Sequence, residues 1–225
     1  MAFLLSLILS QVLAAPVTSL YLGKATRNNE VVYTEKHEVT EEGDQVLTAL
    51  TTYQRPDGEV IATLRSDFTK SVTNAEHEMH DRRTDRRYGV RWEGDTPVMW
   101  DRPKDGKERV ERMGKGYAKG KLLIGGQGLH YHMRSRLAEF SKNEVAVALL
   151  IPGKLDWYSF LVIPHEVTPQ RLHFKMKAQS AFLRLFAPSL DIWYSPDGRL
   201  QRYKGLSNLP DDKGDNQIVE IEYSY

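Results

Sequence analysis

Hydrophobic and polar residues alternate along most of this chain with a period of two, the pattern typical of β-strands that expose one face. In residues 59–68, four apolar side chains share one face, namely Val60, Ala62, Leu64 and Phe68. Comparable short runs cover residues 31–40, 45–54, 96–101, 172–178, 191–194, 199–206 and 219–225. Turn signals such as Pro56-Asp57-Gly58 and Pro196-Asp197-Gly198 separate neighbouring runs. Because short turns join adjacent strands in antiparallel pairs, the pattern predicts an antiparallel meander.

The runs at residues 145–151 and 157–163 depart from this alternation, because both of their faces are apolar. The segment Ile151-Pro152-Gly153-Lys154 joins them, and its Pro-Gly pair favours a tight reversal in which the glycine takes the permissive φ. We therefore predict a central β-hairpin that is covered on both faces.

One stretch has helical periodicity instead. Apolar residues at spacings of four, four and three form a single stripe over residues 129–140: Leu129, Met133, Leu137 and Phe140. The helix comes directly before the central hairpin, so its stripe is expected to cover one face of that hairpin.

These elements predict an all-β fold. We expect a single curved antiparallel meander, or a half-open barrel, of roughly ten strands with one amphipathic helix packed on its concave face. Residues 102–121 carry few apolar anchors and predict a mobile loop or an exposed hairpin. The apolar segment 181–190 is expected to cap an open edge.

Composition narrows the function classes. The chain has 225 residues, a formal net charge of +1 and no cysteine. A nearly neutral chain gives no reason to expect a nucleic-acid partner, and the absence of cysteine excludes disulfides, thiol nucleophiles and cysteine zinc sites.

The first 14 residues are apolar at their centre and end in small residues. Val12 and Ala14 fit the −3 and −1 positions of a signal-peptidase site, and the apolar run is too short to span a membrane. We predict a signal peptide over residues 1–14 and a single secreted β domain over residues 15–225, not an integral membrane protein. A buried N-terminal helix is the alternative, and the lack of Lys or Arg before the apolar run favours it.

Residues 125–225 resemble an uncharacterised family of proteobacterial periplasmic all-β proteins. The resemblance rests on Leu129-His130-Tyr131-His132-Met133-Arg134, on Leu150-Ile151-Pro152-Gly153-Lys154-Leu155, and on the segment 191–223 with its Tyr203-Lys204-Gly205-Leu206-Ser207-Asn208. It implies a periplasmic location and brings no known activity, cofactor or catalytic residue.

Candidate chemistry is sparse. His77 and His80 are the best metal ligands, but on a strand they point to opposite faces and cannot chelate together. On a helix, His130 and His132 point to different sides and therefore cannot bind one metal ion together either. The glycine-rich segment 125–128 is expected to act as a hinge, or as an anion site if its N–H groups are exposed. Five arginines alternate with acidic residues and predict an ion-paired surface: Arg82, Arg83, Arg86, Arg87 and Arg91.

Our leading hypothesis is a non-enzymatic envelope protein that binds a lipid-like ligand in the concavity of the sheet, without a cofactor. The expected lining residues come from the central hairpin and the helix: Val147, Leu149, Trp157, Tyr158, Phe160, Met133 and Leu137. Two alternatives remain: an accessory protein with a fully packed core that contacts other envelope proteins through its surface, and a metal-dependent or hydrolytic enzyme.

Overall fold

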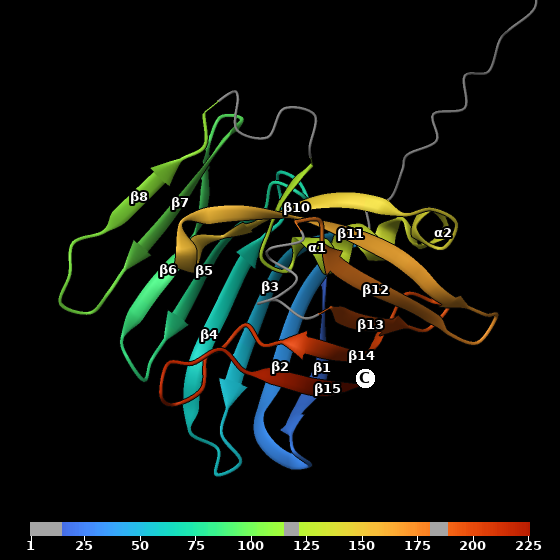
Figure 1. The fold of residues 1–225 in the computed structure, drawn as a ribbon, viewed down its shortest axis with the longest axis horizontal. Coiled ribbons are helices and arrows are strands. Elements are labelled where there is room, and N and C mark those ends of the chain that lie inside the picture. The colour runs from blue at the N-terminus through green and yellow to red at the C-terminus, as the bar shows by residue number, and fades with distance from the viewer. Residues whose placement is uncertain (1–14, 115–121, 181–188) are drawn as a thin grey trace, which may run out of the picture.

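The computed structural model describes residues 15–114, 122–180 and 189–225. In this part of the chain, fifteen strands form one continuous sheet (Figure 1). The N-terminal strands are β1 (Val17–Arg27), β2 (Glu30–Glu42), β3 (Gln45–Gln54), β4 (Val60–Asp67), β5 (Glu76–Asp81), β6 (Arg86–Glu93), β7 (Thr96–Arg102) and β8 (Arg109–Arg112). The C-terminal strands are β9 (Leu123–Gly125), β10 (Val145–Ile151), β11 (Asp156–Val167), β12 (Leu172–Ala178), β13 (Leu190–Tyr194), β14 (Leu200–Leu206) and β15 (Ile218–Ser224).

The strand order is β8-β7-β6-β5-β4-β3-β2-β1-β15-β14-β13-β12-β11-β10-β9. Each half of the sheet is a meander, and the pairing of β1 with β15 joins the halves at the centre. All pairs are antiparallel except β9 with β10, which is parallel. The sheet does not close, because β8 and β9 remain as its two edges.

The all-β prediction is confirmed, but the expected ten strands are too few. The omitted strands include short or highly charged ones: β9 has three residues, and β8 consists of Arg109-Val110-Glu111-Arg112. The expected exposed hairpin within residues 102–121 forms between β7 and β8, while residues 115–121 lie outside the described residues. The predicted edge cap covers residues 181–190, and of these, residues 181–188 also lie outside the described residues.

The sheet folds back on itself, so its two halves face each other. The C-terminal strands run crosswise to the N-terminal strands in Figure 1, and β-bulges, including one between Ala25 and Thr26 and one between Thr40 and Glu41, allow the strands to coil. The 3-10 turn η1 (Pro152–Lys154) at the end of β10 reaches β6 and β7. Residues of both halves share one core cluster there, with Leu150 packed among Val90, Met99 and Met113.

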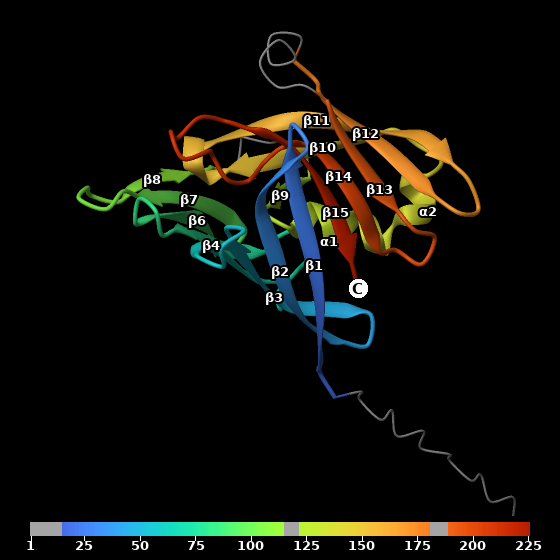
Figure 2. The ribbon, with the colours of Figure 1, turned by 90° about the horizontal axis from the view of Figure 1, so that it is seen from below.

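Two short helices follow β9, and the first of them lies between the halves of the sheet, as the view from below shows (Figure 2). They are α1 (Gly128–Ser135) and α2 (Leu137–Phe140), where one continuous helix was expected. The break occurs at Arg136, whose φ of −132° is not helical and whose N–H bonds to the Met133 carbonyl three residues back. Among the described residues, no helix has the length and hydrophobicity needed to cross a bilayer.

The helical stripe packs on the central hairpin as predicted, but the hairpin is not fully covered on both faces, since Ala146 is exposed and Leu161 is half-buried. Met133 and Phe140 are fully buried in one cluster with Val147 of β10 and Val162 of β11. Tyr131, on the opposite side of α1, packs instead against residues of β1 to β3 and against Phe68, which follows β4. The helix therefore bridges the two halves of the sheet.

The hairpin turn differs from the prediction in one detail. The left-handed residue is Leu155, at φ 52°, rather than Gly153. Leu155 packs against the Leu150 cluster, and this burial offsets the unfavourable backbone conformation.

Candidate functional site

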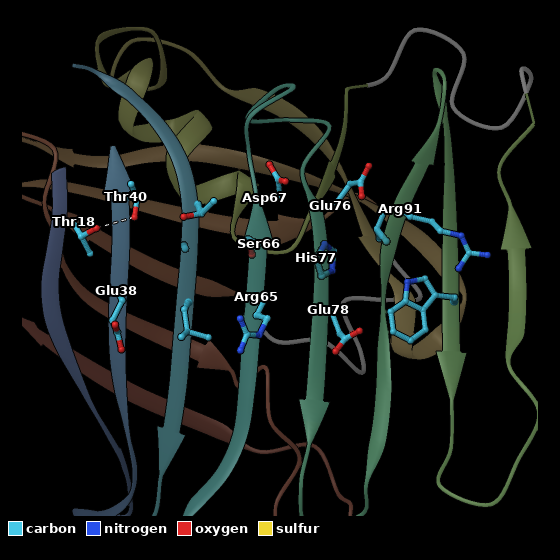
Figure 3. A pocket seen from close by; sticks show the side chains of 15 residues that line it. Thr18, Glu38, Thr40, Arg65, Ser66, Asp67, Glu76, His77, Glu78 and Arg91 are labelled. Carbon is cyan, nitrogen blue, oxygen red and sulfur yellow. Dashed lines mark hydrogen bonds between the residues drawn. The ribbon is translucent and has the colours of Figure 1, made fainter. Parts of the chain in front are cut away.

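Among the described residues, one hollow lies between the halves of the sheet and another lies on its outer surface. The first, called here the inner cavity, has a volume of about 200 Å³. The second, called the outer groove, has a volume of about 690 Å³ and lies over strands β1 to β7 (Figure 3).

The outer groove is an open, charged sheet surface. Its labelled side chains in Figure 3 include Glu76, Glu78 and Arg91. Each of these pairs with a neighbour: Glu76 with Lys70 at 2.8 Å, Glu78 with Arg87 at 3.1 Å, and Arg91 with Glu108 at 3.3 Å. Such exposed pairs contribute little binding energy, so the groove offers weak support for a site.

The inner cavity has mostly apolar and aromatic walls. Its tyrosines are Tyr21, Tyr53, Tyr194, Tyr203 and Tyr223; its aliphatic and thioether side chains are Leu129, Met133, Leu149, Met176, Leu190, Ile192, Leu200, Leu206 and Ile221. The polar lining consists of Glu35, His37, Gln127, His130, Ser207 and Asn208. A hollow with apolar walls and a few convergent polar groups is the usual form of a small-molecule site.

Strand register brings the polar groups of the cavity together. His37 of β2 lies directly opposite Thr51 of β3, and Glu35 lies opposite Tyr53. On the other side of Glu35, the β1 partner is Gly23, which in turn pairs with Tyr223 of β15. All these positions share the inward face, because residues two apart on a strand point the same way.

Gly23 makes room for the two side chains beside it. A Cβ atom at this position would lie 2.9 Å from Cε1 of Tyr223 and 3.1 Å from Oε2 of Glu35. With no side chain at residue 23, the Tyr223 hydroxyl reaches Oε2 of Glu35 at 3.3 Å.

A hydrogen-bond chain extends from Glu35 to the helix. Oε2 of Glu35 is 2.9 Å from Nε2 of His37, and Nδ1 of His37 is 2.9 Å from Oγ1 of Thr51. Gln127, which precedes α1, donates from Nε2 to Thr51 Oγ1 at 2.8 Å and accepts from Ser66 at 3.2 Å. Glu35, His37, Thr51 and Ser66 are all buried, so this chain satisfies polar groups that burial would otherwise penalise.

The tyrosines around Glu35 remain neutral. Burial raises the pKa of Tyr53, Tyr203 and Tyr223 above its usual value, and the charge of Glu35 raises it further. The phenol groups therefore offer hydroxyl donors and neutral ring faces rather than negative charge.

His130 and Tyr194 form a second polar contact in the cavity. The two rings stack with centroids 5.7 Å apart, and Nδ1 of His130 is 3.0 Å from the Tyr194 hydroxyl. Burial, followed by the charge of Arg134, lowers the pKa of His130 to about 3, so the imidazole is neutral near pH 7.

The glycine-rich segment is a tight packing element. A Cβ at Gly125 or Gly126 would lie 3.0 Å from the ring of His77, and a Cβ at Gly128 would lie 2.5 Å from the Val72 carbonyl oxygen. This segment brings Gln127 to Thr51 and Ser66, a role different from the hinge or anion site expected from sequence.

The sequence-predicted lining residues divide into two groups. Leu149 and Met133 line the inner cavity. Val147, Phe160 and Leu137 pack in the surrounding core, Trp157 belongs to the Leu150 cluster, and Tyr158 is half-buried opposite Leu149 on β11.

The two metal candidates do not converge. His77 faces inward and is buried, whereas His80 contacts Asp85 at 2.9 Å near the β5–β6 turn. Within residues 15–114, 122–180 and 189–225, no group of three or more His, Cys, Asp or Glu side chains is placed to hold a metal ion.

Ion pairing is found for most of the arginine cluster, and two members do more than pair at the surface. Arg83 binds Asp81 at 2.8 Å and also reaches Asp212 at 3.3 Å, in the loop before β15. Arg86 binds the fully buried Asp101 at 2.7 Å and donates to the Gly153 carbonyl at 2.9 Å.

Sequence pattern did not identify three polar site residues, Glu35, His37 and Thr51. Their signal lies in the alternation, because Glu35 and His37 fall in phase with the buried Tyr33 and Val39, and Thr51 falls in phase with Tyr53. Polar residues at core positions of a strand mark a buried network or a site.

No protein-family model matches the chain, and a search of the curated proteins finds no significant match.

Proposed function

We propose that this chain is an exported, non-enzymatic protein of the bacterial envelope that binds a small amphiphilic molecule in the inner cavity. The observation that carries the proposal is the cavity itself, which combines apolar and aromatic walls with a polar end at Glu35 and His37. Export rests on the signal-peptide pattern of residues 1–14.

The size of the cavity restricts the ligand. Its volume of about 200 Å³ lies below the roughly 300–1,000 Å³ of pockets that hold drug-sized molecules. A short alkyl or aryl group fits this space, and a whole phospholipid does not. The expected lipid-like ligand is therefore compact, or enters with one short arm.

The polar residues favour binding over catalysis. Thr51, His37 and Glu35 repeat the hydroxyl, imidazole and carboxylate order of a catalytic triad. Thr51, however, is fully buried, does not line the cavity, and already accepts a hydrogen bond from Gln127. A nucleophile must reach the substrate, and this hydroxyl does not.

Methionine NMR tests the proposal, because the cavity carries its own reporters. Met133 and Met176 line the cavity, whereas Met99 and Met113 belong to the Leu150 cluster. In protein labelled with ¹³C at the methionine methyl groups, added 1-hexanol is expected to shift the Met133 and Met176 signals saturably and leave the other two in place. Equal shifts of all four signals, or none, would contradict the proposal.

A matched pair of substitutions provides the control. Leu149→Trp fills the cavity and is expected to abolish the 1-hexanol shifts. Leu20→Trp places the same ring at an exposed leucine of β1 and should leave them unchanged. Native mass spectrometry of protein purified without detergent then identifies any molecule that copurifies with the wild type and is lost in Leu149→Trp.

A further inference from the structure

The inner cavity has one charged side chain. Among its described lining residues, Glu35 is the single Asp, Glu, Lys or Arg. Its carboxylate is almost completely buried, with 4% of the residue surface exposed. Burying a carboxylate is costly unless donors or an opposite charge compensate it.

Within the described part of the chain, the hydrogen-bond partners of the Glu35 side chain are a histidine and a tyrosine, and neither is a lysine or an arginine. Gln127 donates to Oγ1 of Thr51, and this oxygen is also 2.9 Å from Nδ1 of His37. Nε2 of His37 lies 2.9 Å from Oε2 of Glu35. The hydroxyl of Tyr223 donates to the same oxygen, Oε2.

Arg134, the arginine of α1, contacts residues outside the cavity lining. Arg134 pairs with Glu41 of β2, and its guanidinium lies over the ring of Tyr131, 5.1 Å from the centroid. It does not line the cavity. The Glu35 carboxyl group therefore faces the cavity with no lysine or arginine among the described lining residues.

Aromatic rings surround this charge. The carboxylate raises the pKa of Tyr53, Tyr203 and Tyr223 in addition to burial, which places all three phenols within its field, and Tyr21 stacks on His37 with ring centroids 4.3 Å apart. Tyrosine faces attract cations through the ring quadrupole, most strongly where water is excluded. A carboxylate beside neutral tyrosines is a suitable environment for an ammonium group.

We propose that the inner cavity selects amphiphiles with a cationic amine or ammonium group, which Glu35 neutralises, and disfavours carboxylates such as fatty acids. This inference rests on the proposed function, since it names the ligand class of the same cavity. The apolar part of the ligand occupies the side lined by Met133, Leu149 and Met176, while the amine faces Glu35.

Three probes of equal chain length test the inference: hexylamine, 1-hexanol and hexanoate, each titrated at pH 7 with the Met133 and Met176 methyl signals as readout. Hexylamine is expected to bind at least about tenfold more tightly than 1-hexanol, which corresponds to ~1.4 kcal/mol, and hexanoate more weakly than both. This comparison uses the wild-type chain and does not depend on the folding of any variant.

Glu35→Gln then assigns the preference to one side chain. In this variant the ratio of hexylamine affinity to 1-hexanol affinity should fall to about one. Glu38→Gln, on the outer face of the same strand, is the matched control and should retain the preference.

The outcomes separate the two proposals. If 1-hexanol binds but hexylamine binds no more tightly, the charge inference is overturned and the binding function stands. The same holds if hexylamine is preferred and Glu35→Gln keeps that preference. If none of the three probes moves the cavity methyl signals, the proposed function fails and the inference fails with it.

Discussion

At the scale of single residues, the site depends on a missing side chain as much as on those present. Gly23 lies between Glu35 on β2 and Tyr223 on β15, and both side chains occupy the space above it. A larger residue would keep the strand pairing and displace the tyrosine from the carboxylate.

Gly23→Ala is therefore expected to lower the free energy of unfolding by about 1–3 kcal/mol, the usual cost of overpacking a core, and to weaken binding of hexylamine. Urea denaturation and the methionine titration measure the two effects. Gly114→Ala is the control, because a Cβ there would meet no atom within 4 Å. Equal stability of both variants would show that the ring and the carboxylate shift at no cost.

Sequence pattern predicted the inward-facing apolar residues better than the polar ones among them. Leu64 and Ile221 follow from alternation alone, and both are buried. His37 and Thr51 become partners only through the register of β2 with β3, which a one-residue slip would destroy. Gln127 joins them from 76 positions beyond Thr51, a distance in sequence that no local pattern spans.

At the scale of elements, the central hairpin is held at its tip by an arginine of the opposite half of the sheet. Arg86 of β6 bridges Asp101 of β7 and the Gly153 carbonyl in η1. Burial raises the pKa of Asp101, but hydrogen bonds from Arg86 and Arg109 outweigh this and hold the pKa below its usual value. The carboxylate therefore remains ionised throughout the neutral pH range. The contacts of Arg86 with Asp101 and with the Gly153 carbonyl, called here the clamp, stay intact over the same range.

Arg86→Met is expected to cost about 2 kcal/mol of unfolding free energy, since it leaves a buried carboxylate short of one donor and a carbonyl unpaired. Arg87→Met removes the neighbouring arginine, whose exposed pair with Glu78 contributes at most about 1 kcal/mol. Urea denaturation of both variants compares them directly. The clamp is contradicted if the two losses are equal.

Element boundaries were predictable where a local signal exists. Both Pro-Asp-Gly turns form as expected, with Gly58 and Gly198 in the left-handed region. The break in the helix at Arg136 has no such signal, because neither glycine nor proline lies near it. Packing of α1 and α2 against the hairpin places it instead.

At the scale of the whole molecule, the buried histidines couple stability to pH. Burial lowers the pKa of His77 to about 4 and that of His130 to about 3, against about 6.5 in an unfolded chain. Below pH 6.5 these two histidines bind protons in the unfolded chain, whereas in the folded chain they remain unprotonated until the pH approaches 4. Stability is therefore full above this pH and falls as the pH decreases toward 4.

We expect the free energy of unfolding to fall by roughly 1.5 kcal/mol per histidine between pH 6.5 and pH 5, since the unfolded histidine is already half protonated at pH 6.5 and each further pH unit adds at most about 1.4 kcal/mol. Urea denaturation across this range measures the slope. His77→Gln should reduce the slope. A slope unchanged in His77→Gln would contradict the assignment.

The global topology was beyond the reach of the sequence pattern. Alternation and turns specify neighbours along the chain, and each meander follows from them. The pairing of β1 with β15 and of β9 with β10 depends on contacts between distant segments, and the fold-back of the sheet depends on bulges that leave no composition signal.

The pairing of β1 with β15 also has a consequence for synthesis of the chain. Leu22 lies opposite Ser224, so one edge of β1 stays unpaired until β15 has been made. Until residues 218–224 emerge, the nascent N-terminal meander presents an open edge to any other strand, and the Glu35 end of the cavity lacks Tyr223. A chain that ends before β15 is thus expected to aggregate more readily than the full chain, although it contains fourteen of the fifteen described strands.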